Sequence, residues 1–323
     1  MDDQAERTRF YETQANPAPH GLFGGKLRLL DQVTLRHAFS ASTLDHSRGT
    51  VLLLQGRNEA IEKYFETIAD LNRMGWGVLT FDWRGQGGSS RLTRSARRGH
   101  VSSFTNYLND LESIVQSVLL PDCRGPYVVM AHSMGALVAL TAAPRLANIV
   151  ERMVLAAPLV ALPAAVIGPA PMHVGATLGR LFGLGALPVR REAPASRRMT
   201  ARDNPLTHDA RRFERNMALT QAAPQLFLGA PSVAWLAAVT GAMRRLEESD
   251  VVAAFRVPTL MVLAGGDEIV SNAAAERLAW RMRSARSLTL PAARHELLQE
   301  ADRYREPFLE AFDRFCTGVA AAA

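Results

Sequence analysis

The chain has 323 residues, of which 48% are hydrophobic and 21% are charged. This composition is typical of a folded globular protein and excludes a disordered or fibrous chain. The net charge is +6 at pH 7, but no helix-turn-helix, zinc-finger or aromatic–basic strand pattern accompanies it, so we expect no nucleic-acid partner.

The cysteines and the apolar runs further limit the kinds of protein that the chain could be. Cys123 and Cys316 lie far apart and match no metal-ligand spacing, which predicts neither a disulfide framework nor a metal site. The acidic, polar start differs from a secretory signal, and the apolar run 155–167 is broken by prolines and shorter than the roughly 20 residues that span a bilayer. We therefore expect a soluble cytoplasmic protein.

Short aliphatic runs bounded by turn residues alternate with helical patterns in the first half of the chain. The runs predict buried parallel strands over Val51–Leu54, Val78–Phe81, Tyr127–Ala131 and Met153–Ala157. The helical patterns between them cover Ile61–Met74, Phe104–Leu119 and Met134–Ala142. Such alternation predicts an α/β fold with a mostly parallel sheet.

A fifth strand, Thr259–Ala264, follows only after a long interval, and then come a helix over Ala273–Arg283 and a sixth strand over Ser287–Leu290. A single core stops growing at about 250 to 300 residues, so we interpret the interval as an insertion. The predicted parts are an N-terminal segment with leading antiparallel strands (1–44), a core (45–159 and 249–318) and a helical cap (160–248).

The predicted cap is rich in arginine. Between Arg180 and Arg215 there are nine arginines (180, 190, 191, 197, 198, 202, 211, 212 and 215) and four acidic residues (192, 203, 209 and 214). One interpretation is a surface for anionic headgroups or a membrane, and the other is a solvated helical face. The apolar residues among and after them either line an acyl pocket or pack the cap on the core.

The segment Tyr127–Gly135 is typical of a nucleophile elbow, in which a strand turns sharply into a helix at Ser133. Small residues are needed two positions before and after the serine, and Ala131 and Gly135 meet that need. The N–H of Met134 would then face a bound carbonyl. A buried serine in an ordinary turn is the alternative interpretation.

A serine nucleophile needs a base and an acid that orients it. In this layout they follow the nucleophile in the order acid, base, on loops after late strands. Asp267 follows the strand Thr259–Ala264 after two glycines, and His295 follows the last strand. We predict Asp267 as the acid, with Glu268 as its rival, and His295 as the base.

The second oxyanion donor should be a backbone N–H in the loop after Val51–Leu54, from Gln55, Gly56 or Arg57, and Arg57 is our choice. The glycine-rich segment Asp82–Ser89 lacks the ending of a P-loop and the spacing of a dinucleotide fingerprint, so we expect a structural turn and no nucleotide. His132 and His100 are expected to be structural.

Several motifs together resemble the lysophospholipase and monoacylglycerol lipase group of the α/β-hydrolase superfamily. They are Gln55–Glu59, Phe81–Ser89, Arg98–Val101, His132–Gly135, Gly266–Asp267 and His295–Glu296, within about residues 45 to 316. The resemblance implies the α/β-hydrolase fold with a cap that forms an acyl pocket, and hydrolysis of one acyl ester through an acyl-enzyme without metal or cofactor.

The chain departs from the family pattern at two positions. Gln55 stands where His or Pro is common, and Ala131 stands where the elbow usually has Gly. The first change leaves a backbone donor available, whereas the second adds a methyl group at a crowded turn.

The expected substrate is a lysophospholipid, with transient membrane contact and an undetermined oligomeric state. A monoacylglycerol or a general carboxylic ester is the alternative. Peptide hydrolysis is a further rival, although a basic cap does not suit a free N-terminal amine. A non-catalytic scaffold that binds a hydrophobic ligand is the alternative of another class.

Overall fold

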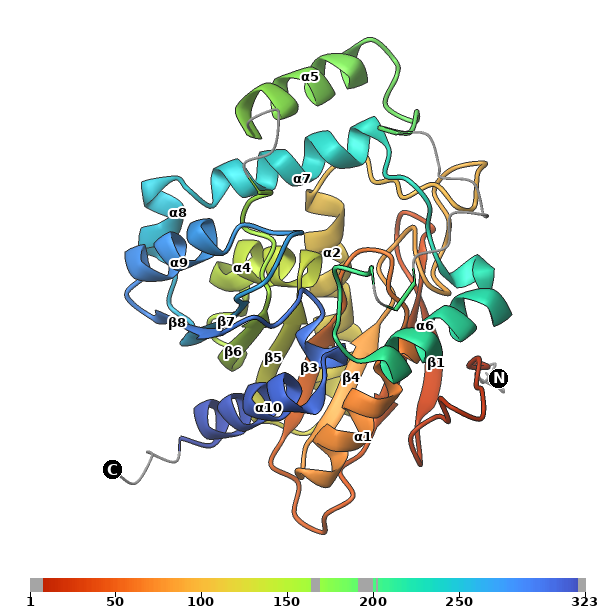
Figure 1. Ribbon diagram of the computed structural model, residues 1–323, viewed down its shortest axis with the longest axis vertical. Helices are drawn as coiled ribbons and strands as arrows, with labels where there is room; N and C mark the ends of the chain where they lie inside the picture. Colours follow the sequence, from red (N-terminus) through yellow and green to blue (C-terminus); the bar gives the residue numbers. More distant parts are fainter. Residues whose placement is uncertain (1–7, 164–168, 191–199, 202, 319–323) are drawn as a thin grey trace.

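The computed structural model describes residues 8–163, 169–190, 200–201 and 203–318 (Figure 1). Its sheet has the strand order β1-β2-β4-β3-β5-β6-β7-β8. The strands are β1 (Phe23–Arg28), β2 (Thr34–Ser40), β3 (Thr50–Leu54), β4 (Gly77–Phe81), β5 (Tyr127–His132), β6 (Val150–Ala156), β7 (Thr259–Ala264) and β8 (Ala285–Leu290). β2 pairs antiparallel with β1 and β4, and all other neighbours are parallel, so the predicted mostly parallel sheet is confirmed.

Helices flank the sheet on both sides. They are α1 (Phe65–Arg73), α2 (Thr105–Ile114), α3 (Leu120–Asp122), α4 (Met134–Leu146), α5 (Pro169–Leu181), α6 (Ala210–Ala222), α7 (Val233–Arg245), α8 (Ser249–Ala254), α9 (Asn272–Arg281) and α10 (Asp302–Thr317). In Figure 1, α1 and α10 lie in front of the sheet, with α2 and α4 behind it. Among the described helices, none combines the length and the apolar character that crossing a membrane requires.

The boundaries of the four predicted helices differ from the observed ones, and those of α9 differ by only one or two residues. The helix predicted over Ile61–Met74 begins with a 3₁₀ turn and becomes α-helical only at Phe65, and the one predicted over Phe104–Leu119 ends in a π-helical turn, Val115–Leu119. α4 continues past Pro144, although proline removes one helical hydrogen bond. Because α4 is buried almost along its whole length, packing outweighs that loss.

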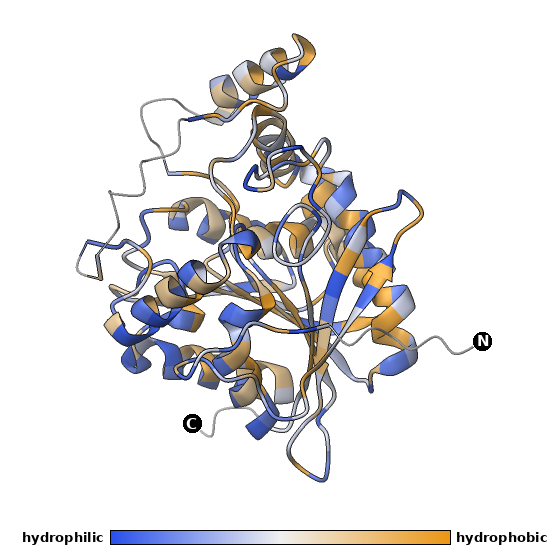
Figure 2. Ribbon diagram, turned by 90° about the vertical axis from the view of Figure 1, so that its right-hand side faces the viewer, coloured by the Kyte–Doolittle hydropathy of each residue, from blue (hydrophilic) through white to orange (hydrophobic). Residues whose placement is uncertain are grey.

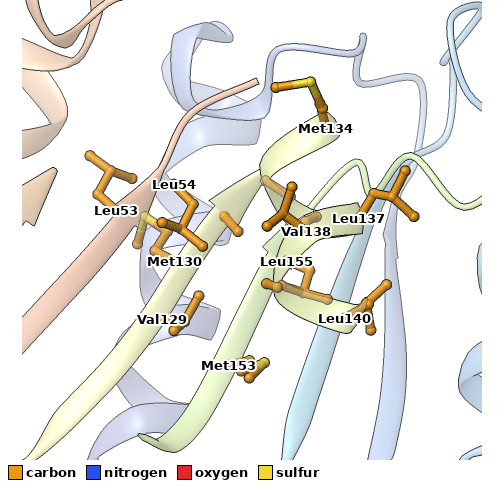
Figure 3. Close-up of a cluster of buried hydrophobic side chains, with 14 of the residues drawn as sticks. Leu53, Leu54, Val129, Met130, Met134, Leu137, Val138, Leu140, Met153 and Leu155 are labelled. Atoms are coloured by element: carbon orange, nitrogen blue, oxygen red, sulfur yellow. The ribbon is translucent and has the colours of Figure 1, made fainter. Parts of the chain in front are cut away.

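The core lies where α4 packs against the central strands. Figure 3 shows apolar side chains of α4 beside those of β3, β5 and β6. Leu137, Val138 and Leu140 of the helix are at most 1% exposed. Burying each such side chain stabilises the fold by about 1.5–3 kcal/mol, which fixes the first turn of α4 against the end of β5.

The residues between β6 and β7 include α5 to α8. α7 lies over the loops that leave β3 and β4, because the Ser232 N–H donates to the Gly99 carbonyl and the Arg57 guanidinium lies over the Trp235 ring. α5 packs on α7, at the top of Figure 1. α7, with α5 on top of it, therefore lies at the end of the sheet from which the loops after the parallel strands leave.

Candidate active site

Ser133 joins β5 to α4 by itself, since the strand ends at His132 and the helix begins at Met134. Its φ of 50° and ψ of −112° are rare for serine and store strain of about 1–3 kcal/mol. Backbone hydrogen bonds hold it there: the Ser133 N–H donates to the Ala156 carbonyl, and the Ser133 carbonyl accepts from the Leu159 N–H. The result is a strained strand-to-helix turn with a serine at its apex.

The small residues around Ser133 meet different neighbours. A Cβ on Gly135 would lie 2.5 Å from the Leu54 carbonyl oxygen and 2.6 Å from that of Gln55, so only glycine fits there. Ala131 is fully buried and pairs with Leu54 across the sheet. The methyl group at position 131 is therefore accommodated without a change in strand register.

Three side chains from separate loops meet at this turn. His295, which follows β8, places Nε2 3.1 Å from Ser133 Oγ and Nδ1 2.7 Å from Asp267 Oδ2. Asp267 follows β7. Ser133 is 8% exposed and His295 is 4% exposed, so little water reaches the two atoms that would exchange a proton. With the proton on Nδ1, Nε2 is free to accept one from the serine.

The Asp267 carboxylate is fixed by its own loop. Its Oδ1 accepts from the Ile269 and Val270 N–H groups at 2.7 and 3.1 Å, and the side chain is fully buried. The rival acid, Glu268, is exposed. A Cβ on Gly265 would lie 2.9 Å from the Ala292 nitrogen, so the two glycines before Asp267 let its loop pack against the loop that carries His295.

A buried ionic cluster lies beside these residues. Lys63 Nζ is 2.8 Å from Glu59 Oε1 and 2.6 Å from Glu296 Oε1, and Glu59 also accepts from the Tyr64 hydroxyl at 2.5 Å. Burial would raise the pKa of the Glu59 carboxyl, but Lys63 and His132 together hold it well below its usual range. In the sequence, Glu59 and Glu296 stand out only as parts of the family motifs, and no motif includes Lys63 or Tyr64. The one local sign of a pair is the four-residue spacing of Glu59 and Lys63.

His132 connects that cluster to His295. Its Nδ1 is 3.2 Å from Glu59 Oε1, and its Nε2 is 3.2 Å from the His295 carbonyl oxygen. Burial lowers the pKa of His132, but the Glu59 carboxylate outweighs this effect and raises it overall. The predicted structural role of His132 thus takes a definite form, in which it supports the backbone of His295.

The loop after β3 leaves one amide available. The Gly56 N–H donates to the Glu59 carboxylate, and the Gly56 carbonyl accepts from Gln86 Nε2 at 2.9 Å. Within the part of the chain that the structure describes, the Arg57 and Met134 amides form no hydrogen bond to a loop or a side chain. These are the two amides that the sequence predicts as oxyanion donors.

The glycine-rich turn after β4 has a structural role, as predicted. The Asp82 carboxylate accepts from the Ile61 and Gly88 N–H groups and from Arg36 Nε at 2.6 Å. A Cβ on Gly87 would lie 2.0 Å from the Asp82 carboxyl carbon. Further along, His100 Nδ1 lies 2.9 Å from Ser232 Oγ, at the start of α7.

The arginine-rich stretch is not a uniform surface. Arg212 and Arg215 form ion pairs with Glu66 of α1, while Arg180, Arg190 and Arg211 are exposed. Arginines 191, 197, 198 and 202 lie outside the described residues. Across the described ranges, no three His, Cys, Asp or Glu side chains are arranged to hold a metal ion.

Comparison with known proteins identifies relatives with similar sequences. Residues 45–302 match the Hydrolase_4 family, described as serine aminopeptidase, S33. The chain is 28% identical to a probable lysophospholipase L2 of Haemophilus influenzae over 83% of each chain. It is 27% identical to lysophospholipase L2 of Escherichia coli, with 88% of this chain and 85% of that protein covered.

Solved structures share the fold. A soluble variant of monoglyceride lipase from Saccharomyces cerevisiae has a TM-score of 0.74 and 21% identity, over 95% of this chain and 97% of that one. A carboxyl esterase from Bacillus coagulans has a TM-score of 0.72 and 16% identity, over 93% of this chain and 99% of that one. The resemblance to the lysophospholipase and monoacylglycerol lipase group is confirmed, and the chain belongs to the Hydrolase_4 family of α/β-hydrolases.

Proposed function

We propose that the protein is a serine esterase that cleaves one acyl ester, with Ser133 as nucleophile, His295 as base and Asp267 as orienting acid. One observation carries the proposal: His295 lies between the other two side chains, at 3.1 Å from Ser133 Oγ and 2.7 Å from Asp267 Oδ2. This arrangement moves a proton from a weak nucleophile to a positioned base.

In the proposed reaction, Ser133 Oγ attacks the ester carbonyl carbon while His295 Nε2 takes the hydroxyl proton. The Met134 and Arg57 N–H groups stabilise the oxyanion. The bond to the alcohol oxygen then breaks, and His295 gives the proton to the leaving alcohol. Water attacks the acyl-enzyme, His295 takes its proton, and the fatty acid leaves as the proton returns to Ser133.

A lysophospholipid is the proposed substrate. Two relatives that match over more than four-fifths of the chain are named as lysophospholipases, which supports this choice. A monoacylglycerol or a small carboxylic ester is the second candidate, favoured by the fold shared with a monoglyceride lipase and a carboxyl esterase. The family description also names aminopeptidases, so a peptide substrate belongs in the test.

The segment 160–248 would act as a cap that meets the lipid. α5 and the residues after it expose large apolar side chains, among them Leu181 at 74% and Phe182 at 78%. Figure 2 shows orange, hydrophobic residues on this helix at the top of the molecule. Apolar side chains gathered on one exposed helix are typical of a surface that touches lipid aggregates, so we include transient membrane contact in the proposal.

The experiment compares wild type with Ser133→Ala. Fatty-acid release is measured from lysophosphatidylcholine, lysophosphatidylglycerol and monoacylglycerol with the same acyl chain, p-nitrophenol release from short p-nitrophenyl esters, and p-nitroaniline release from proline p-nitroanilide. We expect release from the lysophospholipids that falls at least about 10⁴-fold in the variant, with an unchanged Tm. An active Ser133→Ala protein would contradict the mechanism, and turnover of neutral esters or the anilide alone would contradict the substrate.

A further inference from the structure

Arg57 carries a guanidinium that is enclosed by neutral groups. Its Nη2 donates to the Gly229 carbonyl oxygen at 2.5 Å, and its guanidinium carbon lies 5.3 Å from the centre of the Trp235 ring. Gly99 packs so closely that a Cβ there would lie 2.8 Å from Nη2. The Nε atom is buried and has no hydrogen-bond partner among the residues that the structure describes. The side chain is thus held in place by its surroundings with donor capacity left over.

Arg57 is partly buried, and the fully buried arginines among the described residues differ from it because each pairs with a carboxylate. The pairs are Arg36 with Glu62 and Asp82, Arg84 with Asp110, Arg212 with Glu66, and Arg305 with Asp70. In the described ranges, Arg57 forms no ion pair with a carboxylate. Arg190 also carries a positive charge, so it repels the Arg57 guanidinium and gives it no counter-charge.

The Arg57 guanidinium nevertheless remains charged. Burial lowers its pKa to about 10, Tyr107 opposes this shift and Arg190 adds to it. At neutral pH the group is still protonated. A partly buried cation without a carboxylate partner is costly to desolvate, and a planar guanidinium is the side chain best suited to bind an oxyanion such as phosphate. An anionic ligand would therefore supply the charge that the protein does not.

The position of Arg57 in the chain brings its guanidinium near the ester bond that would be cleaved. Its loop touches the elbow, since a Cβ on the preceding residue, Gly56, would lie 2.9 Å from His132 Nδ1. The Arg57 amide is the proposed oxyanion donor, so its backbone faces the ester carbonyl. In a lysophospholipid, only the glycerol backbone separates that ester from the phosphate, and a single arginine can reach both.

We propose that the Arg57 guanidinium binds the phosphate of a lysophospholipid headgroup and makes the enzyme prefer this substrate to a neutral monoacylglycerol. The inference rests on the proposed function and adds a specificity-determining residue to it. Arg57 also links the loop after β3 to Gly229, and a purely structural clamp is the competing explanation. Loss of a clamp would lower kcat/KM for all substrates by the same factor, whereas loss of a phosphate ligand would lower it further for the substrates that carry phosphate.

The first test measures kcat/KM for lysophosphatidylglycerol and for monoacylglycerol with the same acyl chain. In Arg57→Gln we expect the ratio of the two values to fall by about tenfold to a hundredfold, mainly through KM for the phospholipid, because a charge-assisted pair is lost. Arg57→Lys should recover part of the ratio. Arg244→Gln, which removes an exposed arginine at the far end of α7, is the matched control and should leave the ratio unchanged. An unchanged ratio in Arg57→Gln, or equal losses on both substrates, would overturn the proposal.

The second test needs no turnover. Glycerophosphoglycerol, the water-soluble product, should raise the Tm of Ser133→Ala but not that of the double variant Ser133→Ala/Arg57→Gln. Inorganic phosphate and glycerol are the comparison ligands. Stabilisation by inorganic phosphate without stabilisation by the diester would assign Arg57 to a free anion and overturn the headgroup assignment. If Ser133→Ala still hydrolyses the esters, the proposed function fails whatever Arg57 does.

Discussion

α5 and α6 both lie between β6 and β7, yet the chain holds them in opposite ways. The first turn of α6 is anchored to the core: Arg212 is 3% exposed, pairs with Glu66 of α1 and Asp302 of α10, and donates to the Glu300 carbonyl. α5 packs mainly on α7, and its last residue, Leu181, and the residue after it, Phe182, are exposed. Buried charges therefore hold α6 in a fixed position, whereas α5 presents an apolar surface to its surroundings.

The inserted segment therefore uses its residues in two ways, as buried ion pairs in α6 and as exposed apolar side chains in α5. A buried arginine that is paired with carboxylates holds neighbouring elements in a fixed arrangement, and its removal destabilises the fold. An exposed apolar side chain contributes little to folding and is available to a lipid. Arginine-rich composition alone does not distinguish the two, since Arg211 and Arg212 are neighbours with opposite exposure.

The largest expected effect comes from removing the α6 anchor. Arg212→Met would leave Glu66, Asp209 and Asp302 without their shared partner and the Glu300 carbonyl without its donor, and we expect the free energy of unfolding in urea to fall by about 2–3 kcal/mol. Arg211→Met removes the adjacent exposed arginine and should change it by less than about 0.5 kcal/mol. Similar small changes in both variants would show that α6 is not anchored in this way.

The pH dependence of stability sharpens the same comparison. Burial raises the pKa of Glu66, but hydrogen bonds from Arg212 and Arg215 outweigh it and lower this pKa from 4.5 to about 2. A lowered folded-state pKa gives stability that is present above about pH 4.5 and is lost as the pH falls towards 2. Because Glu66 is partly exposed and solvent screens its ion pairs, the advantage of wild type over Glu66→Gln in urea unfolding should be about 1–2 kcal/mol at pH 7 and shrink by pH 3.5. A difference that does not change with pH would contradict this assignment.

The smallest effect on folding is expected at the C-terminal end of α5. Phe182→Ser, directly after this helix, should leave the free energy of unfolding within about 0.5 kcal/mol, since the side chain is 78% exposed. Binding to phosphatidylglycerol vesicles, measured by sedimentation, should weaken about tenfold because a large apolar group no longer enters the interface. Trp280→Ser, at a 91% exposed site on α9, serves as the matched control. Equal loss in both variants would mean that binding is not localised at α5.

Local patterns in the sequence were sufficient for the fold class. Apolar runs between turn residues mark the parallel strands, and the predicted boundaries of β3 to β8 differ from the observed ones by at most three residues. The three residues chosen for the site follow β5, β7 and β8, and the structure brings their side chains together. Site residues that directly follow strands are predictable because local motifs mark them. They lie close together because the carboxyl ends of parallel strands are at the same edge of the sheet.

Long-range ion pairs could not be predicted in the same way. Lys63 meets Glu296 across more than two hundred residues, and Arg212 meets Glu66 across 146. No periodicity marks such partners, because a charged residue with a distant buried partner has the same local pattern as one on a solvated face. Arg57 illustrates the same point, since its surroundings come from Gly99, Gly229 and Trp235, which no local motif connects.

The order of the strands also has a kinetic consequence. Ser133 and His295 are 162 residues apart, and they meet only after β7 has paired with β6 and β8 with β7. Contacts between residues so distant in sequence form slowly, because the intervening chain must lose much of its freedom first. In a refolding experiment, recovered hydrolytic activity would therefore report only molecules in which β8 has paired with β7. The circular dichroism signal of helices formed earlier in the chain would recover sooner.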